Sequence, residues 1–284
     1  YRYSLLNQGF DTDTLRLDSQ DIPAHLTALI IADPRKELSD RALARLRKYI
    51  DEGGNLLVAG EPGKQAVLNP LLGLLGITME AGVVAQPSAQ FTPDLVLAHI
   101  TPACAAFTAA LKKTVKEDSL PVVMPGVTGL DDSKVNGFTV TPLLLTDSAT
   151  SWIKKDKLVP DSATVVYNAA AGDERKTAVT ALALSRTVHG RPQRVIVTAD
   201  ADFMSNASLG RYDIPAANFS FSMALFSWLD NGDFPIDTSR PDTIDNRISI
   251  SAKRLATLKI LYIGVLPAIF VALGAILLIR RRRK

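Results

Sequence analysis

The chain has 284 residues, of which 47% are hydrophobic and 21% charged, enough for one large or two small domains with a buried core. The formal net charge is +3, but the last five residues are all cationic, so the remainder carries a small net negative charge. Composition therefore excludes a basic nucleic-acid-binding surface. The lone Cys104 excludes an internal disulfide and a thiolate metal site, and its small apolar neighbours indicate a buried, inert thiol.

The N-terminal part alternates strand and helix patterns. Residues 14–17 are a candidate short strand, and the apolar run at residues 26–32 (LTALIIA) is typical of a parallel strand buried on both faces. Ser39 is placed to cap a helix with helically spaced apolar positions, and two glycines end that helix before a strand at residues 55–59. This βαβ unit predicts an α/β fold, a three-layer sandwich with a mostly parallel sheet.

The rest of the extramembrane region is predicted as shorter elements. A helix at residues 69–75 ends at Gly76, and the proline-rich middle leaves strands and long loops. The α/β pattern returns in a strand followed by a helix whose apolar face we assign to Phe219, Met223, Phe226 and Leu229. The further predicted elements are strands at residues 122–124, 140–145 and 194–199, a strand pair at 161–168 and 177–185, and a helix at 218–229.

The C-terminal segment is predicted to cross a membrane. Residues 260–279 (ILYIGVLPAIFVALGAILLI) contain no charge, and as a helix they would be about 30 Å long, the thickness of the bilayer's hydrocarbon core. Pro267 is expected to bend this helix. The cationic run at residues 280–284 follows the span, and the positive-inside rule places such a run in the cytoplasm. The preceding region is therefore expected on the extracytoplasmic side.

This orientation has a consequence for the N-terminal side. A large domain cannot precede its only anchor across a bilayer without an export signal, and no signal peptide is recognisable near Tyr1. We therefore expect the chain to be the C-terminal part of a longer polypeptide, or to be processed. The preceding part is expected to contain a signal or further membrane spans.

Glu61 occupies a position of potential chemical interest. The turn of residues 60–63 (GEPG) follows a predicted buried strand, where class I glutamine amidotransferase-like folds place a Cys or Ser nucleophile. Here the residue is a glutamate, and no histidine is near it in sequence. The competing interpretation is a surface turn with a solvated carboxylate. We assign no catalytic residue.

A second candidate group follows the strand at residues 194–199. Asp200 and Asp202 lie where open α/β sheets bind ligands, and paired carboxylates there could hold a cation. The alternative is turn and capping chemistry, in which Asp202, Ser205 or Asn206 satisfies backbone N–H groups. The chain's three histidines form no metal-binding array, so we predict no metal site and no cofactor. The candidate ligand- or partner-binding residues are Glu61, Asp200, Asp202 and Asn206.

Several segments together resemble the Gldg-type auxiliary component of bacterial ABC transporters, especially the form fused behind an ABC-2 type permease. The likeness lies in IIADPRKELSDRALARLRKYIDEGGNLLVAGEPG, LNPLLGLLGI, VTPLLLTDSATSW, RVIVTADADFMSN and FSWLDNG, followed by the apolar span and RRRRK. The resemblance implies a class I amidotransferase-like fold that lacks the nucleophile. It also implies partners: permease helices, in the same polypeptide or beside it, and an ABC ATP-binding subunit. ATP chemistry would reside in that subunit, because this chain has no GxxxxGK[ST] loop.

The leading hypothesis is therefore a non-enzymatic extracytoplasmic accessory domain of an ABC-2 exporter in the bacterial inner membrane. It would bind substrate or a partner and couple to the permease, with the lipid bilayer as a further contact and no nucleic acid. Two alternatives remain: a membrane-anchored hydrolase that uses the candidate carboxylates, and a free-standing glycan or peptide receptor. The predicted organisation is an α/β domain (1–235), a juxtamembrane connector (236–257), a transmembrane helix (258–280) and a cytoplasmic basic tail (281–284).

Overall fold

The computed structural model describes residues 4–159, 165–235 and 252–283. They belong to two compact units, Tyr1–Asp237 and Thr238–Lys284, and each is described by itself. Residues 236–251 of the connector predicted at 236–257 lie outside the described residues, as do residues 161–164 of one predicted strand.

A seven-stranded mixed sheet forms the centre of the first unit, in the order β1-β2-β11-β10-β8-β5-β6. Only β1, β2 and β11 run parallel to one another, whereas the other four neighbouring pairs are antiparallel. The expectation of a mostly parallel sheet is therefore wrong. The strands are β1 Leu29–Ala32, β2 Leu56–Ala59, β5 Leu95–Ile100, β6 Val122–Pro125, β8 Thr139–Leu145, β10 Val179–Val188 and β11 Arg191–Thr198.

A tight hairpin explains the reversal of strand direction. His189 and Gly190 join β10 to β11, and both have a positive φ, at 49° and 75°. Two residues of this conformation match the twist of paired antiparallel strands. β10 therefore pairs with β11 and with β8. The predicted pairing of residues 177–185 with residues 161–168 is not formed by residues 165–168, which are irregular, and residues 161–164 lie outside the described residues.

The predicted βαβ unit is confirmed. α1 (Asp40–Asp51) begins after Ser39, whose Oγ accepts a hydrogen bond from the Ala42 N–H at 3.1 Å. Gly53, with a φ of 91°, allows the chain to turn into β2, which is buried throughout. β1, however, is an edge strand with Ile30 41% exposed, so it is not buried on both faces. The strand predicted at residues 14–17 is not formed.

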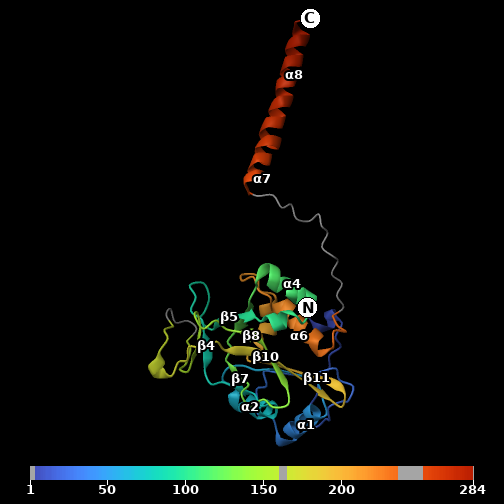
Figure 1. Cartoon of the computed structure of the whole chain (residues 1–284), viewed down its shortest axis with the longest axis vertical. Helices are drawn as coiled ribbons and strands as arrows, with labels where there is room; N and C mark the ends of the chain where they lie inside the picture. The colour runs from blue at the N-terminus through green and yellow to red at the C-terminus, as the bar shows by residue number, and fades with distance from the viewer. Residues whose placement is uncertain (1–3, 160–164, 236–251, 284) are drawn as a thin grey trace. The chain divides into compact units, whose positions relative to one another are not determined.

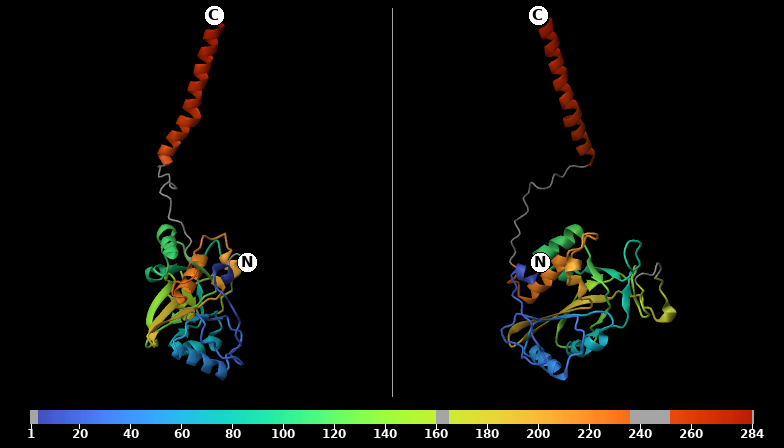
Figure 2. Two further views of the ribbon diagram at one scale, coloured as in Figure 1. Left: turned by 90° about the vertical axis from the view of Figure 1, so that its right-hand side faces the viewer. Right: turned by 180° about the vertical axis from the view of Figure 1, so that it is seen from behind.

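Helices cover both faces of the sheet (Figure 1). α1 and α2 (Gln65–Leu72) lie on one side, and α4 (Ala109–Asp118) and α6 (Asn218–Leu229) lie on the other, an arrangement also visible from two further directions (Figure 2). The result is three layers of helix, sheet and helix. The more specific likeness to class I amidotransferases remains a prediction.

α6 has the predicted bounds but a different buried face. Phe221 and Leu225 are completely buried, whereas Phe219 and Phe226 are only half-buried. The expected apolar face is therefore confirmed at Met223 and Leu229, which are buried, and only in part at Phe226, which packs against the core from its margin. Phe226 instead packs near Phe10, with ring centroids 5.8 Å apart. A helix with apolar residues around most of its circumference has several equivalent faces, so tertiary packing decides which is innermost.

Smaller elements complete the first unit. Gly76 ends the 3-10 turn after α2 with a φ of 76°, as predicted for a helix end. Two short antiparallel pairs, β3 with β7 and β4 with β9, flank the main sheet. Their bounds are β3 Thr78–Met79, β4 Val83–Ala85, β7 Leu130–Asp131 and β9 Trp152–Lys154, and the remaining helices are η1 Leu5–Gln8, η2 Gly73–Leu75, α3 Pro102–Ala105, η3 Ala169–Ala171, η4 Asp202–Met204 and α5 Asn206–Leu209.

The second unit is one helical run of α7 (Ala252–Lys259), the π-helical segment η6 (Ile260–Val265) and α8 (Leu266–Arg282). Residues 254–282 have a mean hydropathy of 2.6 in their most apolar window, and none of that window is buried. The length and composition fit a membrane anchor. The π-helical segment ends two residues before Pro267. Proline has no N–H, and its ring clashes with the preceding turn, so regular α-helical hydrogen bonding is interrupted there.

Candidate functional site

Carboxylates gather where the three parallel strands end. The Asp33 N–H donates to the Ala59 carbonyl at 2.9 Å, and the Gly60 N–H donates to the Thr198 carbonyl at 2.9 Å, so the pairing continues just past the strands. Residues that directly follow β1, β2 and β11 therefore share one edge of the sheet. We call Asp33, Glu61, Asp200 and Asp202 the carboxylate edge.

Glu61 links two of the turns at this edge. Its Oε1 accepts hydrogen bonds from the backbone N–H groups of Ala201 at 2.8 Å and Asp202 at 3.2 Å. Burial raises the pKa of Glu61, and the charges of Asp202 and Asp33 raise it further, against the opposing effect of the two N–H donors. The half-buried, bonded side chain does not fit the alternative of a solvated surface glutamate.

Gly60 allows this turn to lie close to the core. A Cβ atom at Gly60 would come within 2.7 Å of the Met79 sulfur and 2.8 Å of the Leu68 Cδ1. A larger residue would therefore have to displace core side chains. The close packing of Gly60 fixes the backbone from which Glu61 extends.

Asp200 is the most deeply buried carboxylate of the edge, with none of its surface exposed. Its Oδ1 accepts from the Asp202 N–H at 2.6 Å, but its Oδ2 is buried and has no hydrogen-bond partner in the described part of the chain. Burial raises the pKa of Asp200 well above its usual range, and the nearby charge of Glu61 raises it further. The geometry therefore favours a protonated, neutral Asp200 beside Glu61.

Asp202 and Asn206 differ from these two residues. Asp202 is exposed at the start of η4, and its backbone joins it to the edge. Asn206 is also exposed, but among the described residues its side chain has no hydrogen bond to Glu61, Asp200 or Asp202. The cap of α5 is Ser205, whose Oγ accepts from the Ser208 N–H at 3.2 Å. The structure thus groups three of the four candidates and leaves Asn206 apart.

Asp33 was not predicted as a member of the carboxylate edge. Its φ of 40° is uncommon for a residue with a side chain, and its Oδ1 is buried without a hydrogen-bond partner among the described residues. In the sequence, Asp33 before Pro34 indicates only the end of the strand predicted at residues 26–32. The available signal was its position directly after a predicted parallel strand, the same position that singled out Asp200.

The described residues contain no recognisable catalytic or metal-binding group at this edge. No set of three or more His, Cys, Asp or Glu side chains there has an arrangement that could hold a metal ion. His25, His99 and His189 are exposed and have no hydrogen bond to the carboxylates in the described structure. Cys104 is buried, as predicted, and burial raises the pKa of its thiol to about 12. A thiol with that pKa is a poor nucleophile at neutral pH.

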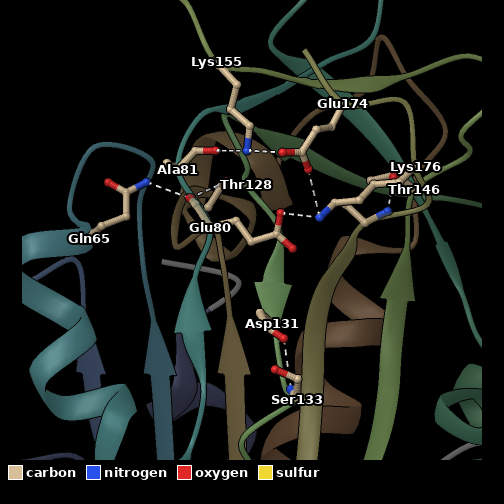
Figure 3. Close-up of polar contacts among 11 residues, drawn as sticks. Gln65, Glu80, Ala81, Thr128, Asp131, Ser133, Thr146, Lys155, Glu174 and Lys176 are labelled. Carbon is tan, nitrogen blue, oxygen red and sulfur yellow. Dashed lines mark hydrogen bonds and ion pairs between the residues drawn. The ribbon is translucent and has the colours of Figure 1, made fainter. Parts of the chain in front are cut away.

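A second polar cluster lies near β3, β9 and β10 (Figure 3). The Lys176 ammonium contacts Glu80 at 2.7 Å and Glu174 at 3.3 Å, and Glu174 also pairs with Lys155 at 3.0 Å. The Thr128 hydroxyl and the Gln65 amide each donate to the Glu80 carbonyl at 3.0 Å. Charges in this cluster are matched within the chain, so we assign it a structural role.

Comparison with solved structures gives a distant likeness. The chain is similar to a structure titled "mmIFT52 N-terminal domain", with a TM-score of 0.49 and 20% sequence identity over 72% of this chain and 77% of that one. A comparison with curated proteins finds no match.

A family model gives a closer assignment. The model described as an ABC-type uncharacterized transport system, ABC_transp_aux, matches residues 1–234, which include every strand of the mixed sheet and the whole carboxylate edge. The chain therefore belongs to the ABC_transp_aux family and is an auxiliary component of an ABC-type transport system.

Proposed function

We propose that this chain is a non-enzymatic accessory domain of an ABC-2 type exporter, anchored in the bacterial inner membrane with its α/β unit on the extracytoplasmic side. The observation that carries the proposal is the family match over residues 1–234, followed in the same chain by a long apolar helix. An anchor of this kind keeps the domain beside its transporter. Even weak docking then becomes effective, because a tether maintains a high local concentration.

Three features support a binding role rather than a catalytic one. Glu61 stands at a strand-to-helix turn, the place where class I amidotransferase-like folds carry a nucleophile. Its carboxylate accepts hydrogen bonds from two backbone N–H groups. No histidine is hydrogen-bonded to it in the described residues. The chain also has no phosphate-binding GxxxxGK[ST] loop, so ATP hydrolysis is assigned to a separate subunit.

The carboxylate edge is the proposed contact surface for a transporter subunit or substrate. Asp202 is exposed and Glu61 is half-buried, so a basic group of a partner can approach both. A partner that buries this edge would supply the positive charge that the described residues do not provide. Asn206, on the neighbouring turn, is proposed as an outer contact of the same surface.

Affinity purification of the full chain from its native membrane in mild detergent tests the association. We expect a multi-span permease and an ATP-binding subunit to co-purify. Glu61→Gln combined with Asp202→Asn should reduce their recovery by about fivefold or more, because the charges are lost while the Glu61 oxygen that accepts the backbone bonds is kept. Asp13→Asn combined with Asp156→Asn, which also removes two negative charges but from exposed positions elsewhere, is the matched control.

The two possible failures of this experiment have different meanings. A chain that purifies alone contradicts the accessory role. Unchanged recovery with the double variant contradicts only the assignment of the carboxylate edge as the contact surface.

Sidedness is tested by labelling single introduced cysteines. Tyr212 is 96% exposed, whereas the native Cys104 is fully buried and should stay silent. A membrane-impermeant maleimide should label Tyr212→Cys in intact spheroplasts and should label Arg283→Cys only after permeabilisation. The reverse pattern would place the α/β unit in the cytoplasm and overturn the proposed orientation.

A further inference from the structure

A cavity lies away from the carboxylate edge, at the amino ends of the parallel strands. Its volume is about 700 Å³, within the usual range for small-molecule sites. Four separate segments line it: the loop at residues 22–27, the end of α1, the β10–β11 hairpin and the turn after α6. The polar and aromatic residues of the lining include Tyr49, Glu52, His189, Arg191, Asp230 and Asp233.

Two amide side chains, those of Asn55 and Gln193, hold these walls together. The Asn55 amide donates to the Thr27 and Leu229 carbonyls at 3.1 Å each and accepts from the Arg194 N–H at 2.9 Å. The Gln193 amide, completely buried, donates to the Ile50 carbonyl at 2.8 Å and the Gly54 carbonyl at 2.9 Å. The cavity is therefore preformed by a tied framework rather than by loosely packed loops.

The cavity has an excess of negative charge. Glu52 and Asp230 are the C-cap residues of α1 and α6, so two helices end there with an acidic side chain at the negative end of the helix dipole. Asp233 adds a third carboxylate from the turn that follows α6. Acidic residues at helix C-termini are unfavourable on their own, and here two of them and a third carboxylate on the following turn surround one cavity.

One carboxylate oxygen of Asp230, Oδ2, is buried and has no hydrogen-bond partner in the described part of the chain. Burial raises the pKa of Asp230, and the charge of Asp233 raises it further. A cation bound in the cavity would offset the repulsion between the two aspartates.

The basic side chains near the cavity do not pair with Asp230 or Asp233 among the described residues. Arg186 donates to the Ile50 carbonyl and to Gln193, and Arg194 donates to the Trp228 carbonyl. Arg191 and His189 are exposed, and neither forms an ion pair with Asp230 or Asp233 among the described residues. Glu52 has only a long surface contact to Lys48, at 3.8 Å.

We propose that this cavity binds a primary ammonium group carried on an apolar stem. The ammonium would pair with the Asp230 and Asp233 carboxylates, and the stem would lie against Tyr49 and the aliphatic side chains of the lining. The group can come from a free amine or from a lysine of a partner protein. This inference depends on the cavity alone and not on the proposed role of the carboxylate edge.

Calorimetric titration of the full chain in detergent with 1,5-diaminopentane tests the site. Uncharged 1,5-pentanediol, which has the same stem, is the matched probe and should bind at least about tenfold more weakly. Asp230→Asn should weaken diamine binding by at least about tenfold, whereas Asp156→Asn should leave it within about twofold. Asp233→Asn is the second variant if Asp230→Asn does not fold, and it should also weaken binding.

A further titration distinguishes a free amine from a lysine side chain of a partner protein. The tripeptide acetyl-Ala-Lys-Ala-amide is compared with diaminopentane and with the same peptide containing norleucine. Tighter binding of the lysine peptide supports a partner side chain, and tighter binding of the diamine supports a free amine; both support the ammonium site. Equal binding of diamine and diol, or an unchanged affinity in both aspartate variants, overturns the proposal.

Discussion

Replacing Asp200 by asparagine is expected to make the folded chain more stable at neutral and alkaline pH. Asp200 is fully buried beside Glu61, so the folded chain raises its pKa well above the value in the unfolded chain. The folded state therefore holds this proton more tightly. The stability that the Asp200 carboxyl contributes is fully present below its pKa in the unfolded chain. It is lost as the pH rises through its pKa in the folded chain. Asparagine does not titrate, so this loss disappears.

Thermal unfolding of the full chain in detergent, followed by tryptophan fluorescence, measures the effect. At about pH 8 we expect the Tm to rise by about 2–8 °C, which corresponds to about 1–2 kcal/mol for a domain of this size. The asparagine oxygen can still accept from the Asp202 N–H, so the turn should be kept. At about pH 5 the gain over the wild type should be smaller.

Asp202→Asn is the matched control because it makes the same change of carboxyl to amide at an exposed neighbour. We expect it to change the Tm by less than about 2 °C at either pH. If Asp200→Asn were destabilising at alkaline pH, or if its effect did not depend on pH, a neutral buried Asp200 would be contradicted.

Two arginines in the middle of the apolar helix should release the chain from the membrane. Thirteen of the twenty residues at 260–279 are Leu, Ile, Val or Phe, and together they favour insertion by about 4–8 kcal/mol. Each central arginine costs about 2.5–3.5 kcal/mol, so Phe270→Arg with Leu273→Arg removes most or all of this preference. Both side chains are exposed within their unit, so no packing inside the unit should compensate.

Partitioning after alkaline carbonate extraction measures this release, provided that any upstream membrane spans are first removed by a cleavage site placed before Tyr1. The wild-type chain should stay in the pellet and the double-arginine chain should move to the supernatant. The conservative variant Phe270→Leu with Leu273→Phe keeps the apolar character and should remain in the pellet. Retention of the double-arginine chain in the pellet would show that the helix is not the anchor.

The carboxylate edge shows how far sequence reasoning reached at the site. Asp200 and Asp202 were found because they follow a recognisable buried strand, and Glu61 because it follows another. Their mutual contact was not predicted, since the bonds from Ala201 and Asp202 to Glu61 join positions far apart in the chain. Asp33 was missed because its local sequence reads simply as a strand breaker.

The cavity at the opposite edge had no local signal at all. Its acidic residues are single carboxylates at the ends of two helices, which look like ordinary surface residues in the sequence. They become a group only because the end of α1 leads into β2, and Asn55, just before β2, donates a hydrogen bond to the Leu229 carbonyl at the end of α6.

By itself the sequence determined the features that depend on neighbouring residues. These are the bounds of α6, the Ser39 cap, the βαβ unit and the long apolar helix, because helical period, capping and uninterrupted hydrophobicity are local properties. Only the tertiary structure decided the strand directions, the buried face of α6, the burial of Asp200 and the grouping of carboxylates. Those features arise from pairing and packing between distant segments, where many arrangements satisfy the same local pattern and only the complete fold selects one.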